Sequence, residues 1–280
     1  MSYVIEFFLL VIQKKGTCIV LFLFQISLWG NKCDLSLSGG EHISQKTNIM
    51  NSLEDLKPFI LVNDMDRLWS LLSNCKKTRE KESVTRVDIV LDNSGFELIT
   101  DLVLADFLLS SKLATKIHFY GKTIPWFVSD TTLHDFNWII KQLKHSNNKW
   151  VSQCGVDWED HIKTGRWVYL DHIFWTLPHE FSAMSQVAPD LHAALQKAHL
   201  IFFKGDLNYR KLMGDRRWEF TVPFHEALSG FHPAPLCSIR TLKAEVQVGL
   251  QPGQGEQLTA SEPNWLTTGK YGVFQFDGPL

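Results

Sequence analysis

The chain has 280 residues, 45% of them hydrophobic, which suffices for one large α/β domain or two small ones with a substantial core. A formal net charge of −2 argues against a broad nucleic-acid-binding surface. The five cysteines are scattered without a C-x-x-C pair. They argue against a zinc site or a disulfide framework and favour a reducing compartment, cytoplasmic or nuclear.

The first 28 residues are strongly apolar but lack the pattern of a membrane span. Two apolar runs, Tyr3–Ile12 and Thr17–Leu28, are each shorter than the ~20 residues of a transmembrane helix. A helix through both runs would place the two lysines of the intervening QKKG at 13–16 inside the bilayer, and inserting each lysine there costs ~2.5–3.5 kcal/mol. We therefore predict no stable membrane insertion. We expect an atypical apolar segment at 1–28, a helical and linker lead-in at 29–84, and an α/β domain at 85–280.

The clearest change of pattern lies within Thr85–Leu109. Arg86–Leu91 is rich in β-branched residues and short enough to form one buried strand. The DNSG sequence at 92–95 favours a turn, and the apolar positions from residue 96 onward follow a helical period. Asp92 and Asn93 are therefore expected at the carboxyl end of a strand, where open α/β sheets bind ligands, with Glu97 one turn into the helix.

Strands and helices alternate through the rest of the chain. We predict strands at Thr115–Tyr120, Arg166–Leu170, His199–Phe203, Pro235–Thr241 and Tyr271–Phe276, the last one at the sheet edge. We predict helices at Ser52–Ser73, Phe136–Leu143, Trp150–Gly165 and Asp190–Ala198. The alternation predicts an α/β fold with a mostly parallel, Rossmann-like sheet and helices on both faces, preceded by a remnant helical segment.

Polar residues follow several of these strands. Pro125–Ser129 is expected to be extended and to present Asp130, for which a helix N-cap is the alternative role. The predicted loop Lys204–Arg210 combines Lys, Asp, Asn and Arg, although an ordinary solvated loop could have the same composition. Lys243 follows a further predicted strand. Oxygen donors suit ions such as Mg²⁺ or Mn²⁺, and lysine or arginine suits phosphate. Together they indicate phosphoryl transfer to water.

Motifs of several other enzyme classes are absent from the sequence. It contains no G-x-G-x-x-G, no Walker A motif and no G-x-S-x-G. Ser94 stands where phosphatases of the haloacid-dehalogenase type carry a second aspartate, which argues against a covalent aspartyl-phosphate.

Four motifs together resemble those of the metal-dependent damage-control phosphatases. They are LDNSGFE at 91–97, FVSD at 127–130, KGDLNYRK at 204–211 and RTLK at 240–243. The RTLK motif resembles in particular the sugar-phosphate phosphatase subfamily, also described as acidic residue methyltransferases. The resemblance runs from about Trp29 to the C-terminus.

The resemblance implies that Asp92, Asn93 and Asp130 are the catalytic metal ligands, for Mn²⁺, Ni²⁺ or Co²⁺, with Mg²⁺ as a further candidate. The implied substrates are reactive hexose phosphates such as fructose 1-phosphate and fructose 6-phosphate, hydrolysed by a metal-activated water. The implied substrate contacts are Asp92, Asn93, Glu97, Asp206, Leu207, Asn208, Tyr209, Arg210 and Lys243, with Lys204 and Arg240 as a phosphate clamp.

Two alternative functions stay open at this point. An S-adenosylmethionine-dependent carboxyl methyltransferase activity towards a protein glutamate is also attributed to the family. However, Gly95 alone follows the strand, so no glycine-rich methyl-donor loop is visible. Relatives carry a sizeable helical region before Trp29, where this chain has its short apolar segment. The chain thus resembles a truncated or alternatively started form, and an inactive remnant with exposed apolar surface is the second alternative.

Overall fold

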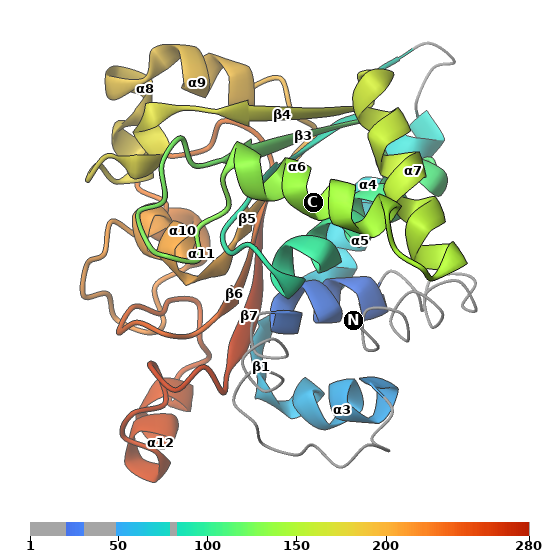
Figure 1. The fold of residues 1–280 in the computed structure, drawn as a ribbon. Coiled ribbons are helices and arrows are strands. Elements are labelled where there is room, and N and C mark those ends of the chain that lie inside the picture. The colour runs from blue at the N-terminus through green and yellow to red at the C-terminus, as the bar shows by residue number, and fades with distance from the viewer. Residues whose placement is uncertain (1–20, 31–48, 79–82, 280) are drawn as a thin grey trace.

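A computed structural model describes residues 21–30, 49–78 and 83–279 (Figure 1). Seven strands form one sheet in the order β1-β7-β6-β5-β2-β3-β4. Strands β2 to β6 are mutually parallel, β7 runs antiparallel to β6, and β1 pairs in parallel with β7. The prediction of a mostly parallel α/β sheet is confirmed.

The elements have the following bounds. The strands are β1 (Ile60–Asn63), β2 (Arg86–Val90), β3 (Lys116–Gly121), β4 (Trp167–Asp171), β5 (Leu200–Lys204), β6 (Leu236–Thr241) and β7 (Gly272–Asp277). The α-helices are α3 (Ile49–Leu56), α4 (Met65–Thr78), α5 (Phe96–Ser110), α6 (Leu133–Lys144), α7 (Lys149–Lys163), α8 (Met184–Val187), α9 (Pro189–Leu195), α10 (Gly205–Leu212), α11 (Phe224–Ala227) and α12 (Gln254–Ser261). Residues 21–30 are also helical.

Two hydrophobic clusters pack on opposite faces of the sheet. Along β5, Leu200 and Phe202 belong to one cluster, and Ile201 and Phe203 belong to the other. Helices α4 to α7 cover the first face and α8 to α11 cover the second, as Figure 1 shows. Because both faces are covered, the central strands β2, β5 and β6 are buried at every residue.

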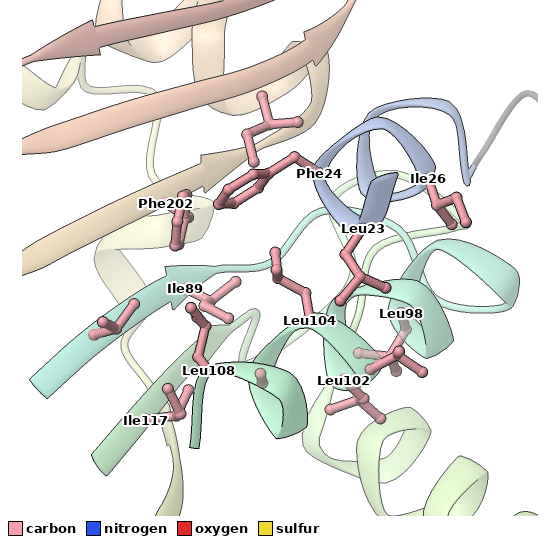
Figure 2. Close-up of a cluster of buried hydrophobic side chains, with 14 of the residues drawn as sticks. Leu23, Phe24, Ile26, Ile89, Leu98, Leu102, Leu104, Leu108, Ile117 and Phe202 are labelled. Atoms are coloured by element: carbon pink, nitrogen blue, oxygen red, sulfur yellow. The ribbon is translucent and has the colours of Figure 1, made fainter. Parts of the chain in front are cut away.

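The helix at residues 21–30 belongs to the first of these clusters. Figure 2 shows Leu23 and Phe24 beside Leu104 of α5 and Phe202 of β5. The ring centroids of Phe24 and Phe202 are 5.7 Å apart. Burying one such side chain contributes roughly 1.5–3 kcal/mol, so this helix stabilises the sheet directly.

Residues 1–20, which hold most of the predicted apolar segment, lie outside the described residues. The domain division at residues 28 and 84 stays a prediction. Within the described ranges, no helix is both long enough and apolar enough to cross a membrane.

One strand was absent from the predicted elements. Residues 60–63, placed in the helix Ser52–Ser73, form the edge strand β1. As a result β7 is an internal strand and not the predicted edge. A short apolar run such as ILV does not distinguish a strand from a helix by its periodicity, which explains the error.

Two loop predictions were also wrong. Pro125–Ser129 is not extended, because it forms bends and a turn in which Asp130 N–H donates to Phe127 O at 3.0 Å. The predicted loop Lys204–Arg210 contains the last residue of β5 and most of α10. The polar residues of this loop therefore occupy a helix that begins directly at the strand end.

Candidate active site

The predicted site residues lie near the carboxyl ends of four adjacent parallel strands. These strands are β3, β2, β5 and β6, whose last residues are Gly121, Val90, Lys204 and Thr241. The order of the strands changes direction between β2 and β5, since β3 and β4 follow on one side and β6 on the other. Such a switch point leaves a crevice in which α/β proteins bind their ligands.

Asp92 and Asn93 leave β2 in this crevice together with Glu97 from the first turn of α5. Asn93 Nδ2 donates to Asp92 Oδ2 at 2.8 Å and to Glu97 Oε2 at 2.9 Å. Both carboxyl side chains belong to residues that are buried. The amide of Asn93 thus holds two carboxylates close together that would otherwise repel each other.

Asp130 is joined to this group through the backbone, by an isolated β-bridge with Asn93. The N–H groups of Trp126 and Phe127 each donate to Asp130 Oδ2 at 2.9 Å. The turn that replaces the predicted extended segment therefore holds the Asp130 carboxylate in place.

Asp130 is not the N-cap of the helix that follows. That position belongs to Thr132, whose hydroxyl accepts from the N–H of Asp135 in a capping box. Helix α6 therefore has its own cap, and the Asp130 carboxylate remains available to the crevice.

Three carboxylates, those of Asp92, Glu97 and Asp130, lie close enough in the crevice to affect one another. Burial raises the pKa of Asp92, and the neighbouring carboxylates of Glu97 and Asp130 raise it further, against the opposing effect of Lys122. A divalent cation at these oxygens would relieve the repulsion between the carboxylates. A set of carboxylate and amide oxygens fits a hard or borderline divalent ion, so Asp92, Asn93 and Asp130 have the chemistry of the predicted metal ligands.

The junction of β5 and α10 packs tightly against Asp92. Gly205 has a φ of +80°, and a Cβ on it would lie 1.8 Å from Asp92 Oδ2. Asn208 Nδ2 donates to Leu91 O at 3.2 Å and to Lys204 O at 2.8 Å. These contacts fix the first turn of α10 to the end of β2, and only glycine fits at the point of closest approach.

Lys204, predicted as part of a phosphate clamp, has its partners within the protein in this structure. Its ammonium group is buried and donates to Ser27 O at 2.6 Å and Ser27 Oγ at 2.8 Å. It also lies 3.0 Å from Asp101 Oδ1 and 3.7 Å from Glu97 Oε1. Since protein atoms satisfy its charge and its donors, Lys204 has a structural role here.

Arg240 likewise has protein partners in place of a phosphate. Its Nε donates to Asp206 Oδ1 at 2.7 Å, and its other nitrogens donate to Ala244 O, Val246 O and Gln247 Oε1. The guanidinium is fully buried over the ring of Tyr209. Arg240 therefore positions Asp206 and does not line the crevice.

The predicted substrate contacts at 206–210 divide into two groups. Asn208 and Tyr209 are buried, and the Tyr209 hydroxyl donates to Gln275 Oε1. Asp206, Leu207 and Arg210 keep a partly exposed surface. Lys243, also predicted, is exposed, and its backbone N–H donates to Asp206 Oδ1 at 3.0 Å.

A cavity of about 610 Å³ opens beside α10. It is lined by Trp126, Phe127, Pro178, His179, Glu180, Ala183, Leu207, Arg210, Lys211, Gly214, Asp215 and Arg216. Trp126 and Phe127 also hold Asp130 through their backbone N–H groups, so the cavity adjoins the carboxylate cluster.

Two lysines near the crevice had no predicted role. Lys122 follows the last residue of β3, and its buried Nζ lies 3.9 Å from Asp130 Oδ1 without a hydrogen-bond partner among the described residues. Lys211 lines the cavity with its Nζ 5.0 Å from the centroid of the Trp126 ring. Burial lowers the pKa of Lys211 to about 8. The position of Lys122, directly after a parallel strand, was the one signal that could have identified it.

Comparisons with known proteins agree with the motifs. The family described as "Damage-control phosphatase ARMT1-like domain" matches residues 19–258. Proteins named damage-control phosphatase ARMT1 are 99% identical over 256 residues in Bos taurus and 81% identical over 258 residues in Homo sapiens. The matches cover 91% and 92% of this chain but 58% of each relative, so the chain spans less than two thirds of their length.

A solved structure of a DUF89 family protein from Pyrococcus horikoshii has a TM-score of 0.46 to this chain at 15% sequence identity. The superposition covers 85% of this chain and 65% of that chain. On the family match, which spans most of the sequence, this chain belongs to the family with a damage-control phosphatase ARMT1-like domain.

Proposed function

We propose that this chain is a metal-dependent phosphatase that hydrolyses phosphate monoesters of small sugars in the crevice between β2 and β5. The observation that carries the proposal is the buried carboxylate cluster at Asp92 and Asp130. Two lysines, Lys122 and Lys243, lie near enough to act on these carboxylates electrostatically. An ion held by Asp92, Asn93 and Asp130 would neutralise charge and would lower the pKa of a bound water molecule.

The protein's own cations would contact the phosphate. Lys122 has an ammonium group without a hydrogen-bond partner among the described residues, and Lys243 is exposed and electrostatically coupled to Asp92. Positive charge fixed at these positions stabilises a phosphoryl group most when its negative charge spreads over three oxygens in the transition state. Both lysines therefore act on kcat as well as on substrate binding.

The sugar would bind on the α10 side of the crevice. Asp206 is held by Arg240 and by the N–H of Lys243, which leaves its other oxygen, Oδ2, for a sugar hydroxyl. The adjoining cavity of about 610 Å³ lies within the ~300–1,000 Å³ typical of small-molecule sites. Fructose 1-phosphate and fructose 6-phosphate, with Mn²⁺, Ni²⁺ or Co²⁺, remain the proposed substrates and metals. The cytoplasm or nucleus remains the proposed location.

Methyl transfer and an inactive remnant are less favoured. The relatives' names refer to a phosphatase, and the chain retains the carboxylates and cations that phosphoryl transfer requires. We therefore retain hydrolysis as the single proposed reaction.

The test is the variant Asp92→Asn, which keeps the shape of the side chain and removes its charge. We expect loss of bound Mn²⁺ and of Mn²⁺-dependent release of phosphate from fructose 1-phosphate, with an unchanged circular dichroism spectrum. Asp157→Asn, an exposed position on α7, is the matched control and should behave as wild type. Undiminished metal-dependent turnover in Asp92→Asn would contradict the proposal.

A further inference from the structure

A second group of possible ligands lies at the other end of the sheet. His225 lies on α11, His232 lies in the segment before β6, and Asp277 is the last residue of β7. Asp277 pairs with Leu236, the first residue of β6, whereas the candidate active site follows Thr241, the last residue of that strand. Five steps along a strand correspond to ~17 Å, so this group is separate from the candidate active site.

The three side chains already converge. His225 Nδ1 lies 2.7 Å from Asp277 Oδ1, and His232 Nδ1 lies 2.8 Å from Asp277 Oδ2. The two imidazole rings stack with centroids 4.2 Å apart and planes inclined by 18°. One donor atom from each residue lies within 4.8 Å of the other two. The fold therefore presents two nitrogen donors and one oxygen donor together.

We propose that His225, His232 and Asp277 bind one borderline divalent ion, Zn²⁺ above all. Two imidazoles and a carboxylate are typical ligands of Zn²⁺, Ni²⁺ and Co²⁺, whereas Mg²⁺ and Ca²⁺ prefer oxygen ligands alone. The scattered cysteines argued against zinc in the sequence, but this set contains no cysteine. Three protein ligands leave at least one position for water.

Binding requires the two imidazole rings to turn out of their stacked arrangement, because each Nδ1 lone pair lies in its ring plane and the planes are inclined by only 18°. A neutral imidazole carries one proton, which now lies on Nδ1 and is donated to Asp277. When the proton moves to Nε2 of the same ring, Nδ1 becomes free to coordinate the ion and no proton is released. Zinc–ligand distances of ~2.0–2.2 Å separate tetrahedral ligands by about 3.4 Å. The present contacts between each Nδ1 and the Asp277 carboxylate must therefore lengthen by less than about 1 Å. The His225 side chain is 67% exposed, so it has room to move.

The ion would connect segments that are distant in the sequence. It would link α11, the segment before β6 and the end of β7, and ion binding to the folded state alone raises stability by mass action. Without an ion, His225 and His232 connect these segments only through their hydrogen bonds to Asp277. The measurement of bound metal distinguishes the two descriptions.

The experiment measures Zn²⁺ per chain by equilibrium dialysis and elemental analysis, together with Tm with and without Zn²⁺. The Asp92→Asn background removes the proposed active-site ion. We expect one Zn²⁺ per chain in this background and a higher Tm in its presence. Adding His225→Gln should weaken Zn²⁺ binding by more than about 100-fold. Loss of a residue that only contacts a metal ligand weakens binding by up to about that factor, and loss of a ligand itself should cost more.

Two comparisons make the result specific. His134→Gln is the matched control, because His134 lies 3.9 Å from a single carboxylate, that of Asp135, and this variant should retain the ion. Wild type and His225→Gln should also differ by one Zn²⁺ even if Asp92 proves not to hold an ion, which separates this proposal from the proposed function. Equal Zn²⁺ content in Asp92→Asn with and without His225→Gln would overturn it, as would absence of bound Zn²⁺ in both.

Discussion

Lys204 and Lys211, at the two ends of one motif, are both buried but have opposite surroundings. Burial opposes the charge of Lys204, but the nearby carboxylates of Asp101 and Glu97 outweigh it and raise its pKa. Lys211 has three aromatic rings around it and donates to Leu177 O at 2.6 Å. Burial lowers its pKa to about 8.

The difference separates cations that hold the fold together from cations that can bind a ligand. We call Lys204 with Ser27, Glu97 and Asp101 the closed cluster, because the ammonium group of Lys204 finds its hydrogen-bond acceptors and its opposite charges within the protein. We call Lys122, Lys211 and Lys243 the open cluster, because the ammonium groups of these residues are not fully neutralised by carboxylates of the described residues. Substitutions in the closed cluster should alter stability, and substitutions in the open cluster should alter turnover.

The largest effect is expected for Lys204→Met. Removing one partner of a buried ion pair leaves the carboxylates of Glu97 and Asp101 without their cation, which typically costs ~3–5 kcal/mol. We expect the free energy of unfolding from urea titration to fall by that amount. Lys197→Met, at an exposed position, is the control and should stay within ~0.5 kcal/mol of wild type. Equal stability of the two variants would show that the cluster is not closed.

Lys243→Ala is expected to reduce turnover without altering the fold. Loss of one fixed donor to a transition-state oxyanion typically costs ~2.7–4 kcal/mol, or about 10²–10³ in kcat. Steady-state hydrolysis of fructose 1-phosphate, with Tm and bound metal measured in parallel, gives the comparison. Lys149→Ala on α7 is the control for loss of an exposed lysine. Wild-type kinetics in Lys243→Ala would show that this lysine is a solvated residue without a role in turnover.

The smallest effect is expected for Lys211, and it depends on pH. Above pH 8 the side chain loses its proton, so kcat/KM should fall by about tenfold, or ~1.5 kcal/mol, as expected for a lost hydrogen bond to a charged group. Lys211→Met should lack this decrease and have the lower value throughout, whereas Lys211→Arg should keep the higher value to more alkaline pH. An unchanged pH profile in Lys211→Met would exclude Lys211 from ligand binding.

The pKa of Lys211 has a second consequence, for stability. The pKa of Lys211 is lowered in the folded protein from its ordinary value of 10.5, so the unfolded chain binds the proton more tightly. Stability should therefore rise with pH between about 8 and 10.5 through this residue. The charge of Lys122 is the second cause that lowers the pKa of Lys211, after burial.

The sequence alone determined six of the seven strands and the edge of the sheet at which the candidate site lies. In Thr85–Leu109 an apolar run, a polar turn and a helical period follow one another, and each depends on residues close together in the chain. The parallel order then requires Asp92, Asn93 and Lys243 to lie near the same edge. The motifs that indicated the family have this local character too.

Only the tertiary structure decided which of the polar residues have partners. Lys204 is matched by Ser27, which is 177 positions away, and Lys211 meets Trp126 in the turn that holds Asp130. His225 and Asp277 are 52 positions apart. The physical reason is that the charge state and availability of a side chain depend on burial and on neighbouring charges, and packing brings those neighbours from distant parts of the chain.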